Sequence, residues 1–172
     1  QVAIAASAPF RADLGTITSW LAGELEDLDI DIRLNSMVDE EMVAEIAPDE
    51  VIIATGTTPR ADGFQLATPS KPIPGHDLPH VYNSWSLFGF DEGAKIEGPA
   101  VVFDDTGTFE AVSVADMLLD AGVHVTMVSR LDKLGENLPY PPVTVGAARE
   151  RLMSGDFDFV GGHYLRSIGP KE

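Results

Sequence analysis

Apolar side chains change their spacing several times along the chain, and each change predicts a different element. Between residues 12 and 28 they recur every three or four positions, typical of one helix face: Leu14, Ile17, Leu21, Leu25 and Leu28. Residues 29–35 alternate apolar and charged side chains, which predicts a half-buried strand. After a short helix or turn near Met42, residues 49–56 (DEVIIATG) form a continuous apolar run. This run predicts a strand buried on both faces.

Residues 100–130 (AVVFDDTGTFEAVSVADMLLDAGVHVTMVSR) predict a strand, a helix and a second strand. The first strand is expected at 100–103 and the second at 123–129. The helix is expected at 110–121, with Gly122 at its C-terminal end and three side chains facing inward: Val114, Met117 and Leu118. Such a βαβ unit has parallel strands and a right-handed crossover.

The remaining segments complete the same alternation of elements. A short helix is expected within residues 81–91, with Asn83 or Ser84 as its N-cap. A further helix is expected at 145–156, followed by strand residues within 157–168. Strands that alternate with helices predict an α/β fold with a mostly parallel sheet.

A long connection divides the pattern into two parts. Residues 57–79 are rich in proline, glycine, serine and threonine, which marks a candidate domain boundary. The chain begins at Gln1 directly on an apolar run, and residues 163–172 have the pattern of a strand leaving a core. We therefore expect a piece of a longer polypeptide.

Composition and charge narrow the possible classes of protein. The chain has 172 residues, of which 44% are hydrophobic and 23% charged, as in ordinary globular domains. A net charge of −17 disfavours nucleic acids and anionic membranes as partners. No apolar run approaches the roughly 20 residues of a membrane-spanning helix. The absence of cysteine removes disulfides, thiolate metal sites and cysteine nucleophiles, and a cytoplasmic setting fits it.

The run VIIATGTTPR (51–60) is the first candidate binding site. The strand must end where the side chains become small, and Gly56 permits a sharp backbone turn. Such a turn lets the main chain approach a ligand at the carboxyl end of a parallel sheet, so Thr55 and Gly56 are candidate cofactor-binding residues. A plain tight turn explains the same residues.

The loop within 100–130 is the second candidate site. A dinucleotide-binding GxGxxG loop needs small residues because its main chain lies close to the pyrophosphate. The corresponding positions here are Thr106, Thr108 and Ala111, and Gly107 is the one glycine of the loop. Thr106, Gly107 and Thr108 are therefore the candidate phosphate-lining residues, although the two threonines add bulk where phosphate oxygens would pass.

Charge in this loop also opposes a diphosphate. Asp104, Asp105 and Glu110 lie within a few residues of the expected site. Each like-charge contact near 4 Å costs about 1 kcal/mol in water and more when desolvated. The attraction of a helix N-terminus, about 0.3–1 kcal/mol, does not offset three such contacts. We therefore do not expect tight dinucleotide binding.

Arg130, in contrast, favours the binding of a dinucleotide. It follows the second strand beside Ser129, at the place where an acidic residue would bind an NAD ribose, and an arginine there suits the 2′-phosphate of NADPH. A solvated arginine at a strand end is the alternative. No catalytic constellation is apparent, and the four histidines have no metal-ligand spacing.

The chain also resembles a known family. VIIATGTTPR is similar to the ATG motif of flavoprotein oxidoreductases with two dinucleotide-binding domains. Residues 11–39, 73–79 (IPGHDLP) and 101–130 resemble the carboxyl-terminal half of one group. This group comprises the trimethylamine, dimethylamine and histamine dehydrogenases with 2,4-dienoyl-CoA reductase, which are NADH:flavin oxidoreductases related to old yellow enzyme.

The resemblance implies a Rossmann-like three-layer fragment of a larger flavoprotein. Residues 1–62 would be the second half of an FAD- or ADP-binding domain, and residues 63–172 a smaller NAD(P)-binding-like domain. The whole polypeptide would contain an upstream TIM barrel with FMN and a 4Fe–4S cluster, and electrons would pass to an electron-transfer flavoprotein.

Three functions remain open. The resemblance favours a nucleotide-binding-type domain of an amine dehydrogenase-like enzyme that positions cofactors and has no catalytic residue or activity of its own. An active NAD(P)H-binding domain that delivers hydride to a flavin is the second. A stand-alone acidic α/β interaction module is the third.

Overall fold

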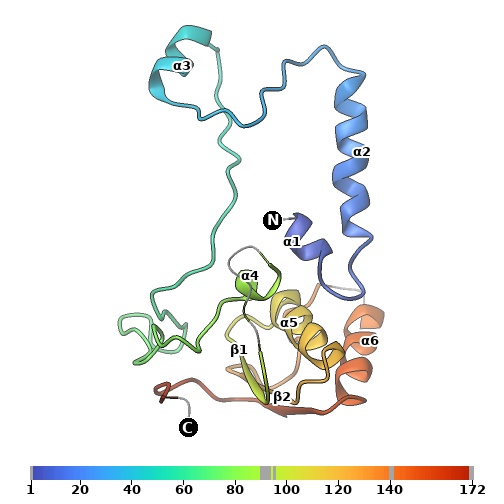
Figure 1. The fold of residues 1–172 in the computed structure, drawn as a ribbon, viewed down its shortest axis with the longest axis vertical. Coiled ribbons are helices and arrows are strands. Elements are labelled where there is room, and N and C mark those ends of the chain that lie inside the picture. The colour runs from blue at the N-terminus through green and yellow to red at the C-terminus, as the bar shows by residue number, and fades with distance from the viewer. Residues whose placement is uncertain (1, 90–93, 95, 140–141, 171–172) are drawn as a thin grey trace.

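The computed structural model describes residues 2–89, 94, 96–139 and 142–170. Figure 1 labels the elements within these residues. In chain order they are α1 (Val2–Ala6), α2 (Leu14–Glu26), α3 (Glu40–Ile46), α4 (Ser84–Leu87), β1 (Ala100–Asp104), α5 (Phe109–Asp120), β2 (Val125–Ser129), α6 (Pro142–Met153) and β3 (Phe157–Val160).

The three strands form a parallel sheet in the order β1-β2-β3. Ala100 is paired with Val125, and Val128 with Val160. Helix α5 contacts β1 and β2, α6 contacts β3, and the two helices contact each other, so both cover one face of the sheet. This arrangement confirms the expected α/β fold with a parallel sheet.

The hydrophobic core lies between that sheet face and the two helices. Met127 on β2 and Leu152 on α6 are fully buried, with 0% of each side chain exposed. The other core residues come from the same elements and the loops between them: Val102, Ala111, Val112, Val114, Ala115, Leu118, Val123, Val125, Leu134, Leu138 and Ala148. The expected inward positions Val114 and Leu118 are confirmed, whereas Met117 is only half-buried and lies outside this cluster.

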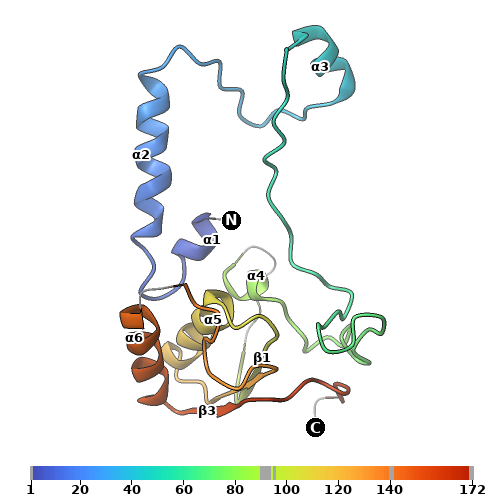
Figure 2. The same cartoon turned by 180° about the vertical axis from the view of Figure 1, so that it is seen from behind.

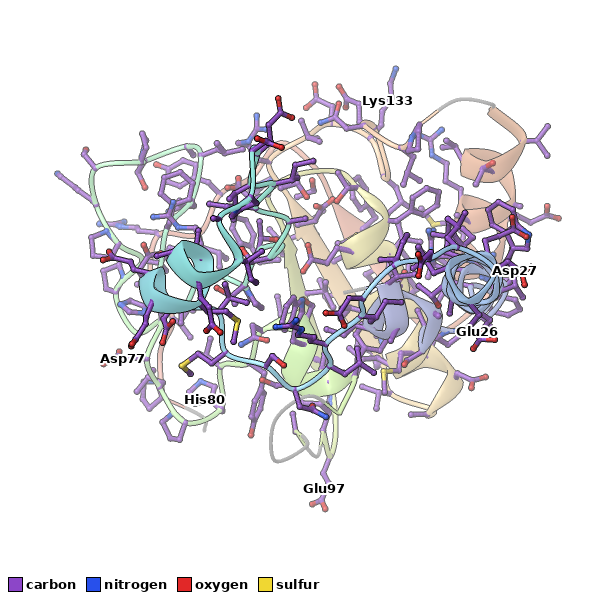
Figure 3. All side chains as sticks on the ribbon, turned by 90° about the horizontal axis from the view of Figure 1, so that it is seen from above. Glu26, Asp27, Asp77, His80, Glu97 and Lys133 are labelled. Atoms are coloured by element: carbon purple, nitrogen blue, oxygen red, sulfur yellow. The ribbon has the colours of Figure 1, made fainter. Side chains whose placement is uncertain are left out.

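Helix α2 and the segment that contains α3 extend away from this core. Figures 1 and 2 show α2 rising from the part that contains the sheet, and the chain then passes through α3 and returns to α4. Seen from above, α2 is viewed end-on with Glu26 and Asp27 at its tip (Figure 3). In the same view, Glu97 before β1 and Lys133 after β2 lie at opposite edges, as parallel strands require.

The strands expected at 29–35 and 49–56 are wrong, because both segments lack regular secondary structure. Ile52 and Ile53 are 89% and 83% exposed. A strand needs a neighbouring strand to satisfy its N–H and C=O groups, and the described residues offer none to these segments. The apolar pattern therefore predicted neither the burial nor the strand pairing of these segments correctly.

The expected helices are present with small shifts of their ends. The helix expected at 12–28 is α2, although none of its residues is buried. Asn83 is the N-cap of α4, and its side chain accepts hydrogen bonds from the N–H groups of Trp85 and Ser86. Residues 90 and 91 of the expected 81–91 helix lie outside the described residues.

The connection after residue 62 is attached to the C-terminal segment. Gln65 is 2% exposed, its amide donates to the carbonyl of Leu165 at 2.7 Å, and its Oε1 accepts from the Leu165 N–H at 3.2 Å. The N–H of Ile168 donates to the carbonyl of Pro74 at 2.8 Å. These contacts bring residues 63–79 to the carboxyl end of the sheet.

Candidate functional site

The loop between β1 and α5 lies at the carboxyl end of the sheet and contains three predicted site residues, Thr106, Gly107 and Thr108. A fourth, Arg130, follows β2 immediately, and its N–H donates to the carbonyl of Asp104 at 3.3 Å. These four residues are therefore close together at the carboxyl end of the parallel sheet, where α/β proteins commonly bind ligands.

Thr55 and Gly56 lie apart from this loop. Both are exposed in the extended segment that descends from α3 (Figure 1). Gly56 has a φ of 75°, in the left-handed region, but residues 50–61 form no turn, so the sharp turn expected there is absent. Their expected role in cofactor binding stays a prediction.

Asp104 occupies the amide groups of the β1–α5 loop. Its side chain is buried, and its Oδ1 accepts hydrogen bonds from the N–H of Thr106 at 3.1 Å and of Gly107 at 2.7 Å. The other oxygen accepts from the Ser129 hydroxyl at 3.4 Å. The amides that would bind a phosphate in a glycine-rich loop therefore already have an anionic acceptor.

The loop is also closely packed from outside. Gly107 has a φ of 68°, and an added Cβ would lie 2.3 Å from Leu131 Cδ1 and 3.3 Å from the Asn137 nitrogen. Asn137 donates to the Gly107 carbonyl from its N–H and to the Thr106 carbonyl from its side chain. The Thr106 and Thr108 hydroxyl oxygens are 3.0 Å apart.

Asp105 connects three parts of the molecule. Its Oδ1 accepts from Arg130 Nε at 3.3 Å, and its Oδ2 accepts from the N–H of Leu66 at 2.5 Å. Arg130 Nη2 also donates to the Asp105 carbonyl at 3.3 Å. The arginine predicted to bind a 2′-phosphate is thus paired with a carboxylate of the chain itself.

Glu110 lies in the first turn of α5, where a helix favours negative charge. Its carboxylate accepts a hydrogen bond from the Ser84 hydroxyl at the start of α4. Thr108, the N-cap of α5, makes no capping hydrogen bond with its side chain. The Glu110 carboxylate therefore places at the N-terminal end of α5 the negative charge that a bound phosphate would otherwise supply.

The residues of this loop do not fit a tightly bound pyrophosphate. A diphosphate would have to displace Asp104 from two amides and Asp105 from Arg130, while both carboxylates stayed close to it. Repulsion between like charges rises steeply where water is excluded. The expectation that the loop does not bind a dinucleotide tightly stays a prediction, and these contacts give its physical reason.

Leu66 and Ser84 belong to the site but were missed by sequence reasoning. They lie 39 and 26 residues from the carboxylates that bind them, so no local pattern reveals them. The role of Asp104 could have been predicted from the sequence, because an aspartate side chain commonly accepts a hydrogen bond from the backbone N–H two residues later, in an Asx turn.

A second polar group lies at the other end of β2. His124 Nδ1 is 2.8 Å from Asp156 Oδ1, and His124 Nε2 is 3.5 Å from Asp158 Oδ2. The hydrogen bond to Asp156 raises the pKa of His124, and burial of the ring opposes this. Among the described residues, no group of three or more histidine, cysteine or acidic side chains could hold a metal ion.

The helices of the described ranges include none that is both long and apolar enough to cross a membrane.

Two curated relatives match three quarters of the chain. N,N-dimethylglycine/sarcosine dehydrogenase of Chromohalobacter salexigens is 35% identical over 75% of this chain and 18% of the relative. A multifunctional alkene reductase/demethylase OYE of Caballeronia cordobensis is 32% identical over 74% of this chain and 17% of the relative. The chain thus spans less than a fifth of the length of these relatives. No family model matches.

A solved structure matches nearly the whole chain. 6-Hydroxypseudooxynicotine amine oxidase of Pseudomonas geniculata N1 superposes with a TM-score of 0.83 and 27% identity, over 98% of this chain and 25% of that protein. The dehydrogenase, the alkene reductase and the amine oxidase agree with the resemblance found in the sequence. The chain belongs to the group of flavin-dependent oxidoreductases that contains trimethylamine dehydrogenase and dienoyl-CoA reductase.

Proposed function

We propose that the chain is a nucleotide-binding-type domain of an amine dehydrogenase-like flavoprotein, and that it positions other parts of the enzyme without catalysing a step. The observation that carries the proposal is the Asp104 carboxylate on the amides of Thr106 and Gly107. Because a carboxylate of the loop accepts the hydrogen bonds of its amides, the loop can keep the shape of a nucleotide-binding unit while the donors that would bind phosphate are occupied.

The proposed architecture has two Rossmann-like units. Residues 1–62 would complete an FAD- or ADP-binding domain, with Thr55 and Gly56 facing the nucleotide, and residues 63–172 would form the smaller NAD(P)-binding-like domain. In the whole enzyme FMN and a 4Fe–4S cluster would supply the redox chemistry. The chain has no cysteine, so the cluster ligands would come from elsewhere in that polypeptide, together with the TIM barrel.

Exposed apolar side chains support a larger assembly. On α2, Ile17 is 50% exposed, Trp20 63% and Leu21 47%, and Ile52 and Ile53 are more exposed still. Trp20 and Leu21 lie three and four residues after Ile17, so the three share one side of α2, and exposed apolar surface of this kind normally marks a face that is covered in the functional protein. In the proposed enzyme the missing part of the FAD- or ADP-binding domain would cover it.

Calorimetric titration of the full chain with NADH, NADPH and ADP tests the role of the loop. We expect no saturable heat from NADH or NADPH at millimolar concentration. The absorption spectrum of the natural polypeptide that contains this chain tests the flavoprotein assignment, and we expect flavin bands. A natural polypeptide without flavin would contradict the proposal.

Arg130 favours a second candidate function, an active NADPH-binding domain that passes hydride to the flavin. This function requires Arg130 to exchange Asp105 for the 2′-phosphate. It predicts saturable NADPH binding by the wild-type chain that Arg130→Ala weakens. The stand-alone interaction module is the third candidate. A natural polypeptide of this length that folds without flavin would favour it.

A further inference from the structure

The donors around Asp105 come from segments that are distant in sequence. The Leu66 N–H belongs to the connection after residue 62, and the Arg130 guanidinium follows β2. The Asp105 side chain is 16% exposed and that of Arg130 is 35% exposed, so the group is partly shielded from water. Both donors point at one carboxylate.

An arginine and a backbone N–H that converge on one point form an anion-binding arrangement. A guanidinium binds carboxylates and phosphates with the same planar fork of donors, and hydrogen bonds to an anion are stronger than neutral ones. The structure therefore contains the donors of an anion site together with an anion, and that anion belongs to the chain.

We propose that the Leu66 N–H and the Arg130 guanidinium form a binding site for a phosphate group, and that Asp105 is the internal anion that closes it. The inference builds on the proposed function, in which the loop holds no nucleotide, and identifies what takes the place of the phosphate. Removal of one carboxylate should then reopen the site.

The chain contains a matched control for this test. Asp62 also bridges an arginine and a backbone N–H: its carboxylate accepts from Arg60, and its Oδ1 accepts from the Phe64 N–H at 3.2 Å. The Asp62 and Arg60 side chains are 57% and 61% exposed, and they are two residues apart. Loss of Asp62 therefore frees the same kinds of donor in open solvent.

The experiment titrates inorganic pyrophosphate into the full wild-type chain, Asp105→Ala, Asp62→Ala and the double variant Asp105→Ala/Arg130→Gln. Binding is measured by calorimetry and by the amide resonance of Leu66. We expect Asp105→Ala to bind at least about tenfold more tightly than the wild type. Asp62→Ala should behave as the wild type, and the double variant should lose the gain.

A parallel titration with adenosine 2′-phosphate distinguishes a nucleotide from a bare anion. Tighter binding of the nucleotide to Asp105→Ala indicates that the site still accepts the adenosine, and equal binding indicates a site for the phosphate alone. Both results support the inference. If the alanine variant does not fold, Asp105→Asn replaces it, because the neutral amide keeps the shape of the side chain but removes the negative charge that pairs with Arg130 and repels a phosphate.

Two results would overturn the inference. In the first, pyrophosphate binds the wild type as tightly as Asp105→Ala, so Asp105 closes nothing. In the second, a folded Asp105→Ala or Asp105→Asn chain binds no more tightly than Asp62→Ala. Saturable NADPH binding by the wild type would instead contradict the proposed function, so the two failures are distinguishable.

Discussion

Arg151 on α6 binds Asp116 on α5 through two hydrogen bonds, from Nε to Oδ1 at 2.8 Å and from Nη2 to Oδ2 at 2.5 Å. The Asp116 side chain is 3% exposed, and the Arg151 guanidinium also lies over the ring of Phe10. The hydrogen bond to Asp116 raises the pKa of Arg151. The pair therefore joins the two helices that cover the sheet to the segment between α1 and α2.

We expect Arg151→Ala to destabilise the chain, because it leaves the buried Asp116 carboxylate without its partner. The expected loss is about 1–3 kcal/mol in the free energy of unfolding, measured by urea denaturation. Arg33→Ala is the control, since the Arg33–Asp31 pair is exposed and should contribute less than about 1 kcal/mol. Equal losses in the two variants would contradict this prediction.

Gly107→Ala should be more harmful than Gly122→Ala. Both residues have positive φ, 68° and 75°, so each substitution costs about 1–2 kcal/mol of backbone strain. At Gly107 the new Cβ also meets Leu131 and the Asn137 main chain, whereas at Gly122 nothing lies within 4 Å. Thermal unfolding should therefore show the lower midpoint for Gly107→Ala, and an equal shift would exclude crowding of the loop.

His124 should contribute to stability only while it is protonated. Its pKa is raised by Asp156, so the contribution is complete below the unfolded-state pKa and is lost as the pH rises through the higher folded-state value. An NMR titration of the ring should give a pKa above that of an unfolded histidine. Asp156→Asn should lower it, and an unchanged pKa in that variant would rule out the assigned cause.

Leu21→Ala distinguishes the isolated chain from the proposed larger enzyme. In the chain alone Leu21 is 47% exposed, so we expect a change in unfolding free energy below about 0.5 kcal/mol. If the missing domain part covers α2, the same change in the longer polypeptide should cost about 2–5 kcal/mol. Leu152→Ala is the control, because Leu152 is buried in the chain itself and should be costly in both.

The local elements were predictable from the sequence where each one packs against a neighbour in the chain. The βαβ unit at 100–129 carries its own partners, so its spacing was sufficient to predict β1, α5 and β2. The run at 49–56 has the same strand-like composition but no partner among the described residues. A hydrophobic pattern identifies the side chains that a sheet would bury, but it does not show whether a partner strand is present.

The candidate site was predictable only in part for a related reason. The negative charge in the β1–α5 loop indicated that a diphosphate would be repelled. In the structure Asp104 accepts a hydrogen bond from the Gly107 amide, and Asp105 accepts one from Arg130. The partner of Asp105 in the connection, the Leu66 N–H, is a main-chain group with no sequence signature. Only the folded chain identifies it.

The contact between Gln65 and Leu165 has a consequence for synthesis of the protein. Both polar ends of the Gln65 amide are bound by one residue that lies 100 positions later. On the ribosome, the connection that contains Gln65 emerges long before its anchor does. The two hydrogen bonds between Gln65 and Leu165 cannot form until translation has passed Leu165, so the Gln65 amide is completed only near the end of synthesis.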